Sequence, residues 1–157
     1  MIEQQRLGEV VEVEGYALAL DRAYQPDDHL WVQPLESGRA RIGIDPLGVE
    51  SGGTLAQLVF APVGTAVARG EPFGSLEAAK FVGPLVSPLS GTIAAHNEAV
   101  LSDPSLAERD PFGDGWLVEL VPSALDEDLA RLVRGDAVAP WFRTKLADYR
   151  LRGVLAE

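Results

Sequence analysis

Glycine and proline interrupt this chain at short intervals and limit the kinds of fold that it can adopt. The sequence contains 16 glycines and 11 prolines in 157 residues. Both residues favour turns over long helices, so the chain should form many short strands instead of a helix bundle. A hydrophobic content of 46% and this length are enough for one domain with a real core.

Short apolar or alternating stretches between these turns predict strands. The turn at residues 36–38 separates two such stretches, which indicates a hairpin. Pro84 and Pro88 cannot occupy a central strand, so residues 82–88 should lie at a sheet edge or in a turn. The expected strands cover residues 10–13, 16–20, 29–35, 39–44, 54–60, 73–78, 90–97 and 116–121, with a short one within 63–72.

Helices are predicted at few places. Asp45 and Pro46 form a good helix start, and Gly52 and Gly53 should end that helix early. A short helical piece is expected at residues 104–108. After Pro122, apolar residues at helical spacing predict a helix over 125–133 and a second one near 141–151.

Charge and composition exclude several classes of protein. The net charge of −11 argues against nucleic acid and against anionic membrane surfaces as partners. The chain has no cysteine, and His29 and His96 have no neighbours at metal-ligand spacing, so we expect no metal site. Residues 110–115 lack the pattern of an EF-hand and should form a structural turn. Without a leader or a long apolar run, a cytoplasmic protein is expected.

Lys80 is the residue that most suggests a function. Of thirteen basic side chains only Lys80 and Lys145 are lysines. Lysine and arginine are equivalent as solvated charges, but only the primary amine of lysine can be acylated to a neutral amide. Lys80 lies between two predicted strands, whereas Lys145 lies in the helical tail. Lys80 is therefore predicted to be a covalent attachment site at a hairpin, as biotin and lipoamide carriers need.

The residues around Lys80 resemble the lipoyl segment of the glycine cleavage system H-protein family. Residues 70–80 (GEPFGSLEAAK) and 87–93 (SPLSGTI) follow the family pattern, as do Asn97, residues 29–32 (HLWV) and residues 110–117 (DPFGDGWL). These motifs occur in family order and cover about residues 27–123.

The resemblance implies a fold and a function. The fold would be mainly β with short helices: a lipoyl-type flattened β-barrel at residues 27–122, an N-terminal extension at 1–26 and a C-terminal helical tail at 123–157. Lys80 would carry covalent lipoate, and Glu77 would help the lipoate-attaching enzyme to recognise the site. The protein would be a carrier and not an enzyme, serving a pyridoxal-phosphate-dependent glycine decarboxylase, an aminomethyltransferase and dihydrolipoamide dehydrogenase.

Departures from the family pattern leave other carriers open. Ala78 replaces a serine of the family pattern, and residues 80–84 (KFVGP) resemble H-protein-like carriers, some of which serve a heterodisulfide-reductase-like sulfur oxidation system. A biotin carrier is a second alternative, although those usually place the lysine between methionines and the only methionine here is Met1. A third is an unmodified structural or regulatory paralogue.

Overall fold

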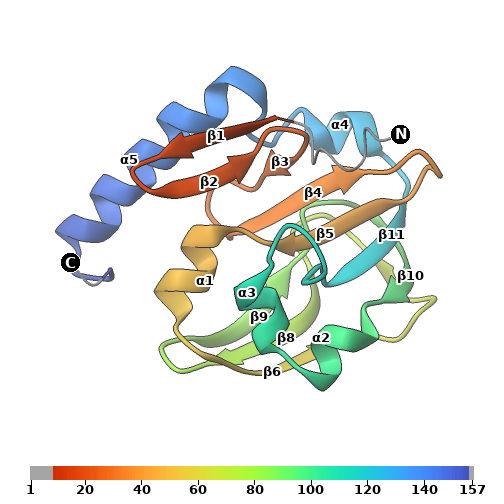
Figure 1. Ribbon diagram of the computed structural model, residues 1–157. Helices are drawn as coiled ribbons and strands as arrows, with labels where there is room; N and C mark the ends of the chain where they lie inside the picture. The colour runs from red at the N-terminus through yellow and green to blue at the C-terminus, as the bar shows by residue number, and fades with distance from the viewer. Residues whose placement is uncertain (1–8, 156–157) are drawn as a thin grey trace.

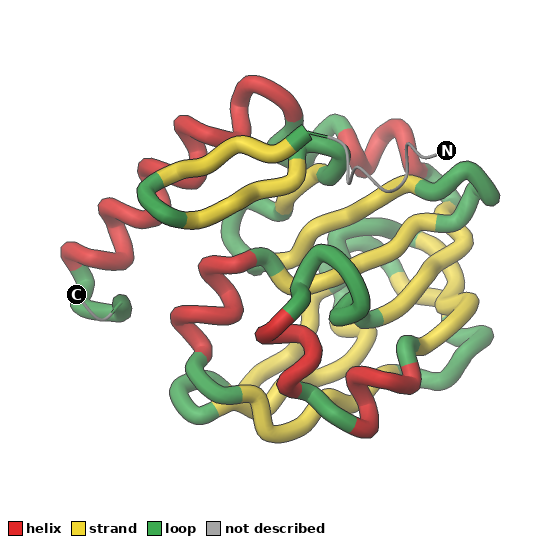
Figure 2. Tube along the Cα trace, in the orientation of Figure 1, coloured by secondary structure: helices red, strands yellow, loops and turns green. Residues whose placement is uncertain are grey.

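Within the part of the chain that the structure describes, the strands form two antiparallel sheets and a separate hairpin. The computed structural model describes residues 9–155 (Figure 2). The six-stranded sheet has the order β3-β4-β5-β11-β10-β7, and the three-stranded sheet has the order β6-β8-β9. The strands of the six-stranded sheet are β3 (Ala23–Tyr24), β4 (Leu30–Pro34), β5 (Ala40–Ile44), β11 (Val118–Pro122), β10 (Gly91–His96) and β7 (Ala66–Val67). The other strands are β6 (Leu55–Phe60), β8 (Pro72–Ala78), β9 (Val82–Val86), β1 (Val10–Val13) and β2 (Tyr16–Ala19).

The two sheets enclose the main hydrophobic core. The inward side chains of the larger sheet include Val32, Ile42 and Leu120, and those of the smaller sheet include Phe73 and Leu85; all five are buried in one cluster. Burying both inner faces removes a large apolar area from water, which is the main term favouring this sandwich. The predicted fold class, a flattened mainly β barrel with short helices, is confirmed.

The helices are short except for the last one. Their bounds are α1 (Pro46–Gly52), α2 (Glu98–Ser102), α3 (Ser105–Arg109), α4 (Leu125–Leu129), the 3-10 helix η2 (Gly135–Ala137) and α5 (Val138–Leu151). The predicted start of α1 is confirmed, because the Asp45 side chain accepts a hydrogen bond from the Gly48 N–H and Pro46 follows it. The predicted stop is confirmed at Gly53.

Two helix predictions differ from the structure. Helix α2 was not predicted. Asn97 caps its N-terminus, because the Asn97 side chain accepts a hydrogen bond from the Ala99 N–H. The helix predicted over residues 125–133 was wrong in length, because α4 ends at Leu129. The reason is that Val133 pairs with Tyr24 through two backbone hydrogen bonds of 2.8 and 2.9 Å, which require extended backbone at both residues.

A second core lies between the N-terminal hairpin and α5. Figure 1 shows β1 and β2 beside α5, outside the barrel. Val13 and Leu18 from the hairpin pack with Phe142 and Leu146 from α5, and Trp31 of β4 joins the same buried cluster. The segment boundaries at residues 26 and 122 stay a prediction. Residues 1–8 of the predicted extension lie outside the described residues.

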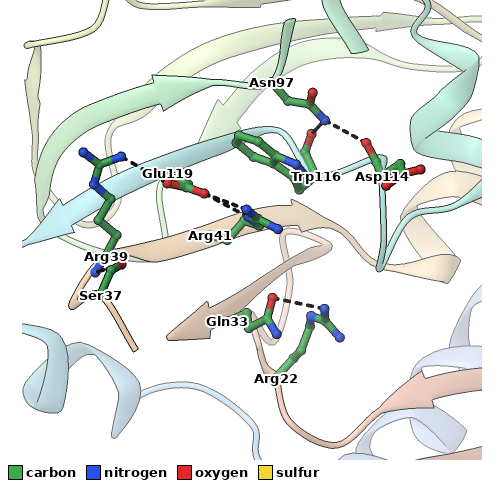
Figure 3. A network of polar contacts seen from close by, with 9 residues as sticks. All are labelled: Arg22, Gln33, Ser37, Arg39, Arg41, Asn97, Asp114, Trp116 and Glu119. Atoms are coloured by element: carbon green, nitrogen blue, oxygen red, sulfur yellow. Dashed lines mark hydrogen bonds and ion pairs between the residues drawn. The ribbon is translucent and has the colours of Figure 1, made fainter. Parts of the chain in front are cut away.

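A polar network ties the turn before β11 to the larger sheet (Figure 3). Arg41 donates two hydrogen bonds to Glu119, and its guanidinium lies 4.4 Å from the centre of the Trp116 ring. The Asn97 amide donates to the backbone oxygens of Asp114 and Trp116 at 2.8 and 2.7 Å. These contacts hold residues 110–117 as an ordered turn against the barrel.

Candidate functional site at the Lys80 hairpin

Lys80 lies at the tip of the β8–β9 hairpin, with its side chain exposed. Only Ala79 and Lys80 lie between Ala78 and Phe81, which form the last contact of the hairpin: the Ala78 N–H donates to the Phe81 oxygen at 2.8 Å. β9 is the outer strand of its sheet, so the predicted edge position of Pro84 is confirmed. The hairpin therefore presents the primary amine on the surface of the protein.

The backbone of this tip is held from outside the hairpin. The Ala79 N–H donates to the Thr54 oxygen at 2.9 Å, and the Lys80 N–H donates to the Gly52 oxygen at 2.8 Å. Between these acceptors, Gly53 has φ +79° and ψ −164°, a region that side chains rarely permit. A β-carbon at Gly53 would lie 3.3 Å from both the Ala79 Cβ and the Lys80 Cγ. The segment after α1 thus fixes the base of the Lys80 side chain.

Glu77 lies on β8, exposed, three residues before Lys80. Its neighbours in register are Gln57 on β6 and Val82 on β9. Ala78, the next residue, is buried, so the alternation of the strand directs the Glu77 side chain away from the core. Glu77 and Lys80 are therefore both exposed on the same hairpin.

A cleft of about 350 Å³ opens beside the Lys80 turn. It lies between the hairpin, α1 and the C-terminal end of α5, which Figure 1 shows on the same side of the molecule. Part of its wall is apolar, made by Leu30, Ile44, Leu55, Leu76 and Leu85. The other part is polar, made by Asp27, Asp28, His29, Tyr149 and Arg152. Lys80 and Phe81 line the same cleft. The cleft can accept a flexible group that carries a polar end.

Two side chains of the polar wall, His29 and Tyr149, form a connected chain with Asp45, which is buried behind them. The Asp45 carboxylate lies 3.5 Å from the His29 Nδ1, and the His29 Nε2 lies 2.6 Å from the Tyr149 hydroxyl. Burial raises the pKa of Tyr149, with smaller opposing effects from Lys145 and Arg152. This group was not predicted from the sequence, because Tyr149 is 120 residues from His29. The only sequence signal was that Asp45 lies at the start of a predicted helix and His29 at the start of a predicted strand.

The other histidine has a different environment. The Nε2 of His96 lies 2.7 Å from the Ala61 backbone oxygen, and its ring packs against Phe60. Within residues 9–155 there is no group of three His, Asp or Glu side chains that could hold a metal ion. Over the same residues, no helix has the length and hydropathy needed to cross a membrane.

Comparison with known proteins identifies relatives of this chain. The family model for the glycine cleavage H-protein matches residues 22–144. Glycine cleavage system H protein 2 of Aquifex aeolicus is 32% identical over 81% of this chain and 79% of its own length. The glycine cleavage system H protein of Salinibacter ruber is 36% identical over 76% of this chain and 94% of its own length.

A solved structure supports the same relationship. The crystal structure of a glycine cleavage system H protein from Mycobacterium marinum superposes with a TM-score of 0.64 and 36% identity, covering 68% of this chain and 87% of that one. These names do not favour the sulfur-oxidation alternative. The order of the motifs around Lys80, the barrel that presents them and the match over residues 22–144 agree: the chain belongs to the glycine cleavage H-protein family.

Proposed function

We propose that Lys80 carries a lipoyl group in amide linkage and that the protein transfers an aminomethyl group between the enzymes of glycine cleavage. Family membership supports the class of function. The observation that carries the site assignment is the position of Lys80, exposed at a two-residue tip whose backbone is anchored to Gly52 and Thr54. A fixed base with a free amine is what a swinging arm needs.

Lys80 is a better acceptor for a lipoyl group than the other lysine. Lys145 lies in α5, and its ammonium group forms an ion pair of 2.6 Å with Asp27. Attachment requires an activated lipoyl ester supplied by the lipoate-attaching enzyme. The Nζ of Lys80 attacks the acyl carbon, the C–N bond forms, and the activating group leaves with its bonding electrons while the amine loses a proton to solvent. Glu77, exposed beside the tip, is proposed to guide that enzyme to the hairpin.

The residues of the cleft fit an attached arm. When bound, the lipoyl group would supply a cyclic disulfide, reducible to two thiols, that is able to carry a small group between partners. The apolar wall, which includes Leu55, Leu76 and Leu85, would bury the hydrocarbon part of the arm, and the polar wall lies in the same cleft. The protein would act as a carrier, because it keeps the arm at high effective concentration near each partner enzyme.

The partners proposed are a pyridoxal-phosphate-dependent glycine decarboxylase, an aminomethyltransferase, dihydrolipoamide dehydrogenase and the lipoate-attaching enzyme. We place this exchange in the cytoplasm. Glycine-dependent decarboxylation by the purified decarboxylase, with and without the lipoylated protein, tests this pathway. Stimulation supports glycine cleavage. A protein that is lipoylated but does not stimulate decarboxylation contradicts the pathway and leaves the lipoyl site intact.

The lipoyl site itself is tested by mass spectrometry. The full chain is incubated with lipoate, ATP and a lipoate ligase, followed by intact-mass measurement and peptide mapping. Lys80→Arg should abolish modification completely with no loss of thermal stability, since an exposed tip side chain contributes little to folding. Lys145→Arg is the matched control, and it should be modified as wild type. Modification of Lys80→Arg, or no modification of wild type, would refute the assignment and favour an unmodified paralogue.

A further inference from the structure

The N-terminal hairpin lies outside the family match and contacts two helices. The match begins at residue 22, whereas β2 ends at Ala19. β1 contacts α5 and β2 contacts α1, and Figure 1 shows this arrangement. The two residues of the turn, Glu14 and Gly15, have φ +51° and +93°. Positive φ at both positions is typical of the type I′ turn, which fits the twist of a tight hairpin. The turn therefore gives Tyr16, the first residue of β2, a defined position.

Helix α5 holds this turn from one side. The Glu14 carboxylate forms an ion pair with the Arg150 guanidinium. The Tyr16 ring packs edge-on against Phe142, with 5.3 Å between the ring centroids and 65° between the ring planes. Phe142 is fully buried, and an edge-to-face contact is a favourable arrangement of two aromatic rings. These contacts fix the direction in which the Tyr16 hydroxyl points.

The Tyr16 hydroxyl connects the hairpin to α1. It donates a hydrogen bond of 2.7 Å to the Oε1 of Glu50. Burial, with a further contribution from Glu50, raises the pKa of Tyr16 to about 12, so the hydroxyl keeps its proton at neutral pH and can donate. Glu50 is exposed, so this bond and not burial restrains its side chain. The C-terminal half of α1 is thus attached to a hairpin that α5 holds.

The last turn of α1 holds the backbone of Lys80. Gly52, the final residue of α1, lies two residues after Glu50, and its oxygen accepts from the Lys80 N–H at 2.8 Å. A seven-residue helix has few hydrogen bonds of its own, so its end frays unless other elements restrain it. Leu47 is buried in the second core and restrains the first half of α1. The bond to Tyr16 restrains the second half, which carries the acceptor for Lys80.

We propose that Tyr16 is a positioning residue for Lys80: through Glu50 and the last turn of α1, the N-terminal hairpin holds the backbone of the carrier tip in place. The coupling between Tyr16 and the tip does not depend on what Lys80 carries. Its consequence for lipoate attachment rests on the proposed function. Because the attaching enzyme acts on the amine itself, a tip held in one position presents Lys80 in the reactive arrangement more often than a fraying tip does.

The coupling is tested by amide hydrogen exchange, followed by NMR on the unmodified full chain. Tyr16→Phe keeps the aromatic ring and removes only the hydroxyl. The amide of Lys80 should then exchange about three to ten times faster than in wild type, which is the factor for loss of one hydrogen bond. The Ala78 amide is an internal control. Its acceptor, Phe81, belongs to the β8–β9 hairpin itself, so its exchange should stay as in wild type.

Control variants separate positioning from a general loosening of the second core. Tyr24→Phe removes a buried hydroxyl that donates to the Ala19 oxygen at 2.6 Å, at the end of the same hairpin, and leaves Glu50 untouched. This variant should keep the exchange of the Lys80 amide within about twofold of wild type. Glu50→Gln retains an oxygen that accepts from Tyr16 and should also behave as wild type, whereas Glu50→Ala should match Tyr16→Phe.

Initial rates of lipoylation test the consequence for attachment. The kcat/KM of Tyr16→Phe should be at least about twofold lower than that of wild type, because a smaller fraction of tips is in the competent position. Tyr24→Phe should keep the wild-type value. The proposal is overturned by Lys80 exchange that is unchanged in Tyr16→Phe or equally fast in Tyr24→Phe, and by faster exchange with an unchanged rate of lipoylation. A wild-type protein that is not lipoylated contradicts the proposed function alone, since exchange is measured without lipoate.

Discussion

The conformation of Gly53 gives the sharpest prediction about the Lys80 tip. Gly53 has φ +79° and ψ −164°, and an added β-carbon would lie 3.3 Å from both Ala79 Cβ and Lys80 Cγ. The backbone strain alone costs about 1–3 kcal/mol for a residue other than glycine. For a chain of this size each kcal/mol lowers Tm by about 2–4 °C, so Gly53→Ala should lower Tm by roughly 2–12 °C.

Gly52→Ala is the control one residue away. Gly52 ends α1, and its β-carbon would meet only Ala78 Cβ at 3.8 Å, an ordinary contact. We expect this variant to stay within about 0.5 kcal/mol of wild type or to gain slightly, because alanine favours helix. Urea unfolding measures both free energies, and the rate of lipoylation measures the effect on the tip. Gly53→Ala should also slow lipoylation, because it displaces the backbone that presents Lys80. Equal stability of the two variants would refute the reasoning.

Two further predictions concern tyrosines and the Glu119 network. At pH 10 the folded protein should show less phenolate absorbance than the unfolded chain, because burial raises the pKa of each of the three tyrosines. The pKa of Tyr16 is raised to about 12, with a further contribution from Glu50, and the pKa values of Tyr24 and Tyr149 are also raised. The folded state then holds these protons more tightly than the unfolded chain, so stability is full below about pH 10 and falls above it. Phenolate absorbance at pH 10 that is equal in the folded protein and the unfolded chain would contradict this. Glu119→Ala should cost about 1–3 kcal/mol in urea unfolding, because it leaves the guanidinium of Arg41 without its two hydrogen bonds. Arg39→Ala, whose side chain is 46% exposed, should cost less than about 1 kcal/mol, and a larger loss there than at Glu119 would be the contrary result.

Local features of the sequence predicted much of the fold. The start and end of α1 followed from Asp45, Pro46 and Gly53, because capping depends on residues close in the chain. The edge position of β9 followed from Pro84, which has no N–H to give to a neighbouring strand. The hairpin position of Lys80 followed in the same way from the strands on either side of it.

Predictions that depended on distant residues were less successful. The length of α4 was wrong, since the backbone pairing of Tyr24 with Val133 joins segments more than 100 residues apart. The apolar stripe at Leu125, Leu129 and Leu132 is compatible with a longer helix. The stripe contains no information about the strand edge with which Val133 pairs, and this pairing keeps Val133 out of the helix.

Part of the candidate site was likewise predictable from the sequence, and part of it arises only in the folded structure. The choice of lysine over arginine at residue 80, with its flanking motifs, identifies the amine and its place in the hairpin, because turn chemistry and side-chain chemistry are local properties. The anchoring of that tip by Gly52 and Thr54, and the contact of His29 with Tyr149, arise only when the barrel closes and α5 packs on it. Each of these contacts joins residues far apart in the chain, and their geometry is set by packing between elements, which no spacing within the sequence encodes.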